Sequence, residues 1–357
     1  MLESVISRFS MSGALIRAER FGSGLINDTY LCEFDDRGST KKYILQHINK
    51  AVFKQPEQVM RNVEIVTAHI QDRLRAEGVE DPWSVTPGLV MTTSGGLYHR
   101  DQEGSIWRMF HFIETGAVFD TVQGPDHAYE VGRGLGRFQA LVSDLPAGRL
   151  HDTLPGFHHT PVYLQQFDDT VRQNKKGRVV DVKAEVGFVE RRRPLAPLLT
   201  EAMQSGRVPV RVVHNDPKVN NILVHRETGK AVCMVDLDTV KPGIVLFDFG
   251  DCVRSAANRA GEDAVDLRSV RLDPDLAGAI TRGYLHEAGS FLTPKEIELL
   301  SVSVKVITFE LGLRFLADYL RGDTYFKIKY PSHNLHRARV QFRLLESIEA
   351  SGSGPVL

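Results

Sequence analysis

The stretch His214-Asn-Asp-Pro-Lys-Val-Asn-Asn221 follows a short β-branched run, and Asp236 comes fifteen residues after its last member. Between them lie two short apolar runs, 222–225 and 231–235, on either side of a five-residue loop that contains Gly229. Two such runs around a glycine-containing loop predict a β-hairpin. A hairpin holds its two ends together, so Asn221, which enters it, and Asp236, which leaves it, are expected to lie close in space.

An Asp, an Asn five residues later and a second Asp after a hairpin form the set that phosphoryl transfer from ATP requires. One carboxylate holds the acceptor hydroxyl, and the other two side chains offer oxygen ligands to Mg²⁺. The spacing matches the kinase pattern H-x-D-x-x-x-x-N with its later metal-binding Asp. We therefore expect Asp216 to be catalytic, and Asn221 and Asp236 to bind Mg²⁺. The alternative is an Asn/Asp-rich turn that only caps backbone groups.

Size and composition restrict the class of protein. At 357 residues the chain exceeds the usual size of one domain, so two lobes are expected. A net charge of −1 argues against nucleic acid or an anionic membrane as the main partner. The three cysteines form no CxxC pair, which favours thiols in a reducing compartment. No basic leader and no run of eighteen apolar residues is present, so we expect a cytoplasmic protein without a membrane partner. Nothing in the pattern indicates an oligomeric state.

The order of the predicted elements indicates an α+β, bilobal protein-kinase-like fold. Residues 1–113 read as a β-rich nucleotide-binding lobe with one helix that begins at Pro56, and residues 114–357 read as a larger, mostly helical lobe. Thr293-Pro-Lys-Glu296 is a capping box that begins a long helix ending near Leu320. Strands are expected at 14–21, 29–34, 42–48, 88–92 and 105–113, and helices at 126–145, 162–172 and 196–204.

The chain resembles the aminoglycoside phosphotransferase-like kinases, and within them most closely the N-acetylhexosamine 1-kinases. The likeness spans nearly the whole chain in order, and the segments after residue 300 point to the subgroup. The segments that carry it lie at 24–30, 43–46, 60–64, 107–114, 214–216, 235–239, 246–251, 312–319 and 330–334. The resemblance implies transfer of phosphate from ATP, with Mg²⁺, to the anomeric hydroxyl of N-acetylglucosamine or N-acetylgalactosamine. Both epimers stay candidates because they differ at one hydroxyl.

The resemblance also implies a nucleotide site. Gly22 and Gly24 fall in the loop that covers the phosphates, where a missing Cβ lets backbone amides approach an anion. Adenine would be bound by backbone groups of the hinge that contains Phe110, Phe112 and Ile113.

Gln46 occupies the strand position where kinases usually carry an ATP-binding Lys, so a Lys–Glu pair with Glu64 is absent. The resembling subgroup also has Gln there. Lys218, two residues after Asp216, could supply the missing positive charge; the alternative is an exposed loop lysine. Asp248-Phe-Gly250 spells the kinase metal triplet, but it lies too far from Asn221, so we assign Asp248 a supporting role and Asp236 the metal.

For the sugar, the resemblance implies contacts from Thr239, Arg314 and Tyr325 together with Asp216. Arg314 lies in an otherwise apolar helix, where an unpaired charge would be costly. Its partner is expected to be either a sugar oxygen or a nearby carboxylate such as Asp318.

Three other functions stay open. The first is a kinase of choline, homoserine or an aminoglycoside, whose cationic substrate would need an acidic lining. The second, a protein kinase, is disfavoured because no Ala-Pro-Glu segment follows Asp236. The third, a non-catalytic nucleotide-binding regulator, is suggested only by Gln46 and is disfavoured because Asp216, Asn221 and Asp236 are all present.

Overall fold

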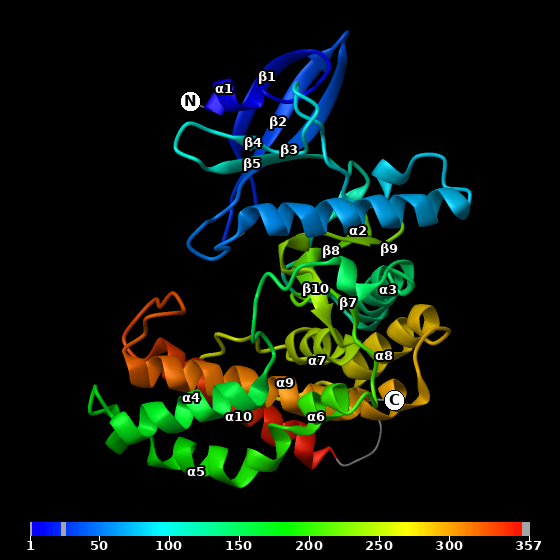
Figure 1. Ribbon diagram of the computed structural model, residues 1–357. Coiled ribbons are helices and arrows are strands. Elements are labelled where there is room, and N and C mark those ends of the chain that lie inside the picture. The colour runs from blue at the N-terminus through cyan, green and yellow to red at the C-terminus, as the bar shows by residue number, and fades with distance from the viewer. Residues whose placement is uncertain (1, 23–25, 352–357) are drawn as a thin grey trace.

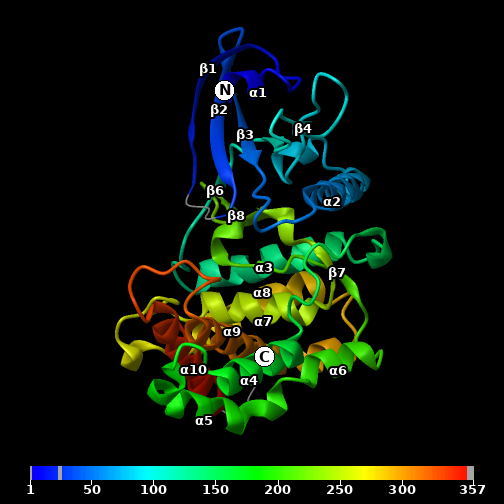
Figure 2. The same cartoon turned by 60° about the vertical axis from the view of Figure 1, so that its left-hand side comes forward.

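The expected α+β, bilobal fold is confirmed in the computed structural model, which describes residues 2–22 and 26–351. Figure 1 shows a small lobe built on a β-sheet above a larger lobe of helices, with α2 (Pro56–Ala76) between the sheet and the large lobe. Figure 2 shows the same order from another side. None of the helices in the described residues is long and apolar enough to cross a membrane.

The small lobe is an antiparallel sheet with strand order β1-β2-β3-β5-β4. The hairpin between β2 and β3 turns at Arg37 and Gly38, whose φ angles are both positive, as tight hairpin turns require. This lobe also contains short elements before and after α2. Its elements are α1 (Leu2–Ile6), β1 (Ala14–Arg20), β2 (Asp28–Asp36), β3 (Ser39–His47), η1 (Pro82–Ser84), β4 (His99–Arg100) and β5 (Ile106–His111).

Helix α2 joins the two lobes. Pro56 stands at its start, and Val59, Val63, Val66 and Ile70 are buried on one face, as the helical spacing predicts. This face belongs to the same hydrophobic core as the upper helices and strands of the large lobe. The position of the sheet relative to the large lobe is therefore fixed by a shared apolar core.

The large lobe contains the segments predicted to be catalytic, surrounded by helices. Its first elements are β6 (Gly116–Ala117), α3 (Pro125–Leu141), η2 (Ala147–Arg149), α4 (Thr160–Gln173), η3 (Arg178–Val182), α5 (Lys183–Arg192), η4 (Arg193–Leu195) and α6 (Leu198–Gln204). The catalytic segments follow as β7 (Arg211–Val213), η5 (Val219–Asn221), β8 (Ile222–His225), β9 (Ala231–Met234), η6 (Leu237–Thr239) and β10 (Lys241–Gly243). The remaining elements are α7 (Val245–Ala256), η7 (Leu267–Ser269), α8 (Pro274–Ala288), α9 (Pro294–Arg321) and α10 (His333–Ala350).

Local signals in this lobe have the predicted outcome. The capping box forms, because Thr293 Oγ1 accepts from the Glu296 amide and Glu296 Oε2 accepts from the Thr293 amide. Strands β8 and β9 pair as the expected hairpin. Glycines let α3 and α8 approach closely, since a Cβ at Gly132 would lie 2.0 Å from the Ile280 carbonyl oxygen.

One predicted strand forms only in part. Residues 88–92 make isolated bridges, Leu89 with Phe110 and Thr92 with Phe9, and bond to β5 through the Val90 amide and the Gly88 carbonyl. The chain turns away at Thr92, whose backbone and side chain both bond Gly96. A local turn therefore ends the extended pairing at Thr92 and keeps it too short for a regular strand.

Candidate active site

The catalytic loop begins where β7 ends, at the fully buried His214. Burial lowers the pKa of His214, so the ring is neutral. Its Nδ1 accepts from the Asp216 amide at 3.3 Å, which leaves Nε2–H to donate to the Val235 carbonyl at 3.0 Å. One buried ring thus connects the loop of Asp216 to the residue before Asp236.

Asp248, in the first turn of α7, lies beneath this loop with no exposed surface. Its carboxylate accepts from the amides of His214 (2.8 Å) and Asn215 (2.7 Å) and from Gln139 Nε2 (2.9 Å). Burial raises the pKa of Asp248, and the His214 ring and these donors act in the opposite direction. The Asp248 carboxylate therefore holds the first two residues of the loop in place through their backbone amides.

Replacing Asp248 by Asn is expected to lower the free energy of unfolding by about 1.5–3 kcal/mol, the usual contribution of a hydrogen bond to a charged group. An amide presents N–H groups where the loop amides need an acceptor. Urea unfolding followed by circular dichroism measures the change, with Asp169→Asn, in an exposed pair with Arg172, as the control. Unchanged stability together with a raised magnesium requirement would assign Asp248 to the metal instead.

Asp216 is surrounded by the two other polar residues of its loop. Its Oδ2 lies 2.8 Å from Lys218 Nζ and accepts from Asn221 Nδ2 at 3.0 Å. Asn221 Nδ2 also donates to the Asp216 carbonyl at 2.8 Å. Within the described residues, Oδ1 of Asp216 is therefore the oxygen that can receive a substrate hydroxyl. Because both side-chain amide hydrogens of Asn221 are used, its side-chain oxygen Oδ1 is the atom that can bind a cation.

Asp236 follows the hairpin in the left-handed region, at φ 61° and ψ 61°. Such a backbone conformation in a non-glycine residue is uncommon and is often found at functional sites. Although its side chain is open to solvent, the surrounding protein and the carboxylates of Asp238 and Asp216 raise the pKa of Asp236 to about 7. A cation bound near Asp236, Asp238 and Asp216 would reduce the repulsion between their carboxylates.

The residues present fit a magnesium ion that is shared with phosphates. Asp236 and Asn221 offer one carboxylate and one amide oxygen, and Mg²⁺ commonly takes one or two protein ligands, with water and substrate phosphates as the others. No group of three or more His, Cys, Asp or Glu in the described residues could hold a metal by itself. The ion would neutralise charge on the phosphates of a bound nucleotide.

The small lobe contains the residues that the sequence predicts to bind nucleotide. Gly22 has φ 77°, which explains glycine at this turn, and Gly24 lies outside the described residues. Gln46 is held by neighbours: its Nε2 donates to Thr29 Oγ1, and its Oε1 accepts twice from Arg108. Glu64 forms an exposed ion pair with Arg61 on the same helix.

The hinge residues lie at and beyond the end of β5. The Phe110 ring packs on the Arg108 guanidinium, and the Phe112 ring meets Phe21 of the glycine turn edge to face, with ring centres 6.0 Å apart. The Phe112 amide donates to the Lys42 carbonyl, and the Ile113 carbonyl accepts from Gly116. Because strand pairing already uses the Phe112 amide, contact with adenine stays a prediction for the other backbone groups of the hinge.

The predicted sugar contacts come from two parts of the large lobe. Thr239 Oγ1 donates to the His214 carbonyl, so this hydroxyl is left only as an acceptor. Arg314 lies against four aromatic rings, with its guanidinium 5.1–5.9 Å from their centres: Phe157, Tyr163, Tyr325 and Phe326. Tyr325 itself is largely exposed.

Asp318 is not the partner of Arg314. Its two oxygens accept from the amides of residues 324–326 and from Asn334 Nδ2, so they fix the segment that follows α9. That segment reaches the glycine turn, because a polar cavity of about 230 Å³ is lined by Phe21, Gly22 and Asn27 on one side and Lys327 on the other. The sequence did not point to Lys327.

Residues 17–288 match the family model APH, the phosphotransferase enzyme family. The chain belongs to this family. A solved aminoglycoside phosphotransferase from Alicyclobacillus acidocaldarius is 13% identical, with a TM-score of 0.62 over 98% of this chain and 95% of that one. Choline kinase from Cryptosporidium parvum is 12% identical, with a TM-score of 0.56 over 94% and 89%. Spectinomycin phosphotransferase, in complex with ADP and spectinomycin, is 11% identical, with a TM-score of 0.55 over 93% and 92%.

The family explains the chemistry of the loop: the protein is a phosphotransferase. The match is broader than the N-acetylhexosamine 1-kinases that the sequence resembles. At such low identities the similar structures establish the shared fold, and the acceptor of this phosphotransferase is argued below from its own residues.

Sequence reasoning missed one buried cation of this phosphotransferase. Arg108 on β5 pairs in register with Gln46 on β3 and has 1% of its surface exposed. Its guanidinium lies 2.5 Å from Asp238, a residue of the large lobe. The signal was present as an arginine inside the apolar run 105–113, but its partner is 130 residues away.

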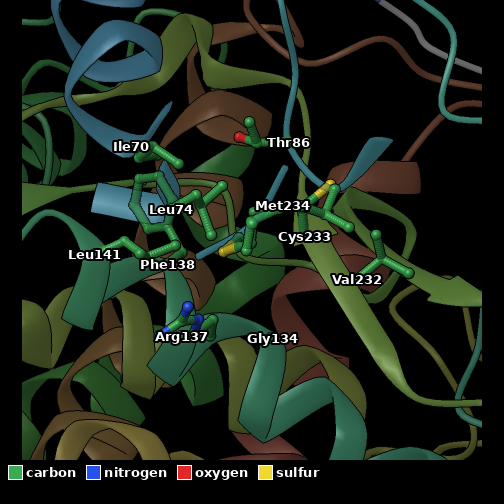
Figure 3. Close-up of a pocket in the computed structure, with 12 residues that line it drawn as sticks. Ile70, Leu74, Thr86, Gly134, Arg137, Phe138, Leu141, Val232, Cys233 and Met234 are labelled. Atoms are coloured by element: carbon green, nitrogen blue, oxygen red, sulfur yellow. The ribbon is translucent and has the colours of Figure 1, made fainter. Parts of the chain in front are cut away.

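A cavity of about 200 Å³ between α2, α3 and β9 is a different site from the predicted one (Figure 3). Figure 3 shows mainly apolar side chains around it, and none of the predicted nucleotide, metal or acceptor residues lines it. Burial raises the pKa of Cys233, in its wall, well above the usual range, so the thiol stays protonated. All three cysteines are free thiols; Cys32 and Cys252 are buried and Cys233 is partly buried.

Proposed function

We propose that this phosphotransferase transfers the γ-phosphoryl group of ATP, with Mg²⁺, to the anomeric hydroxyl of N-acetylglucosamine or N-acetylgalactosamine. The observation that carries the phosphoryl-transfer part is the assembly of Asp216, Lys218, Asn221 and Asp236 around one loop and one hairpin end. A nucleotide donor is supported by the similar spectinomycin phosphotransferase, which was solved with ADP.

The proposed chemistry needs little from the protein beyond positioning and charge. Asp216 Oδ1 accepts a hydrogen bond from the acceptor hydroxyl and so aims its oxygen at the γ-phosphorus. As the new O–P bond forms, the hydroxyl proton passes to Asp216 and ADP leaves with the electrons of the broken bond. Lys218, 2.8 Å from Asp216 Oδ2, places a positive charge beside the transferring group.

The charge of the acceptor region favours a neutral sugar over a cationic acceptor. A small cavity of about 150 Å³ is lined by Arg314, Arg321, Tyr163, Tyr325 and Asp318. Its charged side chains are two guanidinium groups and one carboxylate, that of Asp318, whose oxygens accept from backbone amides, so the net charge of the lining is positive. Choline, ethanolamine and aminoglycosides carry positive charge and would need the opposite lining. Guanidinium and aromatic groups together suit the hydroxyl, carbonyl and apolar faces of an acetamido sugar.

Replacing Lys218 by Met should lower kcat more than it raises KM for ATP. Charge spreads over the γ-phosphoryl oxygens mainly in the transition state, so a cation beside them contributes chiefly to kcat. Steady-state kinetics at saturating Mg²⁺ measure both constants, with Lys230→Met, in the exposed hairpin loop, as the matched control. An unchanged kcat would return Lys218 to the role of a surface lysine.

The acceptor is tested by ADP release with a panel of hydroxyl compounds. N-acetylglucosamine or N-acetylgalactosamine should give the highest kcat/KM. Glucose and galactose should be poorer, because a site built around an acetamide leaves polar groups unpaired without it. Preference for choline, ethanolamine or spectinomycin over both acetamido sugars would overturn the sugar assignment and leave the phosphotransferase assignment intact.

A further inference from the structure

Three polar side chains lie side by side across the small-lobe sheet. Thr29 on β2 pairs in register with Gln46 on β3, and Gln46 pairs with Arg108 on β5. Cross-strand neighbours project from the same face of a sheet. Here each of the three side chains is hydrogen-bonded to the next one across the sheet. Gln46 Nε2 donates to Thr29 Oγ1 at 3.2 Å, and Arg108 Nε and Nη2 donate to Gln46 Oε1 at 3.0 and 2.8 Å.

Arg108, the last side chain of this row, forms an ion pair with a residue of the large lobe. Arg108 Nη1 lies 2.5 Å from Asp238 Oδ1, and the two side chains have 1% and 2% of their surface exposed. Asp238 Oδ2 also accepts from Asn27 Nδ2 at 2.6 Å, and Asn27 lies at the end of the glycine turn. Asp238 is therefore bound by two residues of the small lobe.

Asp238 lies in the short turn η6 that Asp236 begins. The next residue, Thr239, bonds the His214 carbonyl through its hydroxyl, and its own carbonyl accepts from Asn215 Nδ2. One face of this turn is thus fixed to the catalytic loop, and Asp238 fixes it to the sheet. The position of Asp236, at the start of the turn, depends on both attachments.

We propose that Arg108 is the positioning cation of this phosphotransferase, which holds the turn of Asp236 in place through its ion pair with Asp238. This inference rests on the proposed Mg²⁺- and ATP-dependent function. Arg108 acts through Asp238 and not on the phosphates, because it is almost fully buried, its Nε and Nη2 donate to Gln46, and its Nη1 lies in the ion pair with Asp238.

Two other charged residues near the site, Glu64 and Lys218, do not join the sheet to the turn of Asp236. Glu64, on the helix that would supply the usual partner, pairs with Arg61 in solvent. Lys218 pairs with Asp216 within the catalytic loop. Arg108 with Asp238 is the ion pair that joins the nucleotide-binding sheet to the metal-binding turn in the described residues.

The test compares nucleotide binding with and without metal in Arg108→Met, by isothermal titration calorimetry with ADP alone and with ADP plus Mg²⁺. Residues that orient metal ligands typically contribute about 10–100-fold to metal affinity or activity, so MgADP binding should weaken by that factor. Metal-free ADP should bind within about twofold of wild type, because the phosphates do not touch Arg108. Asp238→Asn should give the same split.

A matched control separates positioning from general stability. Arg133 also donates to carboxylates, those of Glu287 and Glu130, but within the large lobe. Arg133→Met should lower the melting temperature without changing the ratio of MgADP to ADP affinity. If Arg108→Met behaves in the same way, with both affinities unchanged, Arg108 is only structural and the proposal is wrong. An equal loss of both affinities would place Arg108 on the phosphates and would also overturn it.

Relocation of the charge is the second test. In the double variant Gln46→Lys/Arg108→Met the introduced ammonium group starts from the strand position that pairs in register with residue 108. Recovery of MgADP affinity toward wild type, with metal-free ADP affinity unchanged, is expected because the role depends on a cation beside Asp238. A gain in both affinities would show that the introduced lysine binds the phosphates directly and would not support the proposal. A folded double variant with no recovery would contradict the proposal. A wild type that binds MgADP but phosphorylates neither acetamido sugar would refute the proposed function while the metal-dependent comparison still decides the role of Arg108.

Discussion

Asp216→Asn is expected to reduce turnover about 10²–10⁴-fold, the range for loss of a general base. The amide keeps the size of the carboxylate but cannot take the acceptor proton, and it loses the ion pair with Lys218. MgATP affinity should change little, because we assign the Mg²⁺ ligands to the neighbouring Asn221 and Asp236 and not to Asp216. Coupled ADP release measures turnover, and calorimetry measures nucleotide affinity.

The control for Asp216→Asn is its stability. The side chain is partly exposed and its loop is fixed by Asp248 and His214, so the melting temperature should stay close to that of wild type. Turnover near the wild-type level in a cleanly purified sample would show that another group receives the proton.

Asp236→Asn is expected to abolish magnesium-dependent turnover. The substitution removes the carboxylate that we assign to the metal, and an uncharged oxygen cannot neutralise an ion that is shared with phosphates. Asn is the informative replacement because it tolerates the left-handed backbone found at this position, whereas Ala would add strain. Activity is measured across a Mg²⁺ titration.

The Mg²⁺ titration of Asp236→Asn is compared with the same titration of Asp248→Asn. Our assignment requires Asp236→Asn to shift or eliminate the magnesium response and Asp248→Asn to leave it unchanged in the folded fraction. The reverse pattern would exchange the two roles and make Asp248-Phe-Gly250 the metal triplet.

Local sequence signals predicted much of this site, since the relevant residues are close in the chain. The hairpin that brings Asn221 and Asp236 together, the capping box at Thr293 and the apolar face of α2 each depend on neighbours within a few residues. The distance of Asp248 from Asn221 along the chain likewise predicted that Asp248 supports the loop, and its bonds to the His214 and Asn215 amides agree with this.

Contacts between distant segments could not be predicted. The pairing of Arg108 with Asp238 depends on sheet register and on how the lobes meet, and neither is written in local spacing. Asp318 was a reasonable partner for Arg314 by helical spacing, yet the amides that follow α9 compete for its oxygens. Aromatic rings from two other segments surround Arg314 instead.

The most direct test of the proposed function is the ³¹P NMR spectrum of the sugar product made from ATP, Mg²⁺ and N-acetylglucosamine or N-acetylgalactosamine. The proposal requires a phosphomonoester signal coupled to the anomeric proton, present with the wild-type enzyme and absent with Asp216→Asn. A phosphorus signal coupled to the C6 protons, or no phosphorylated sugar from an enzyme that binds MgATP, would contradict it.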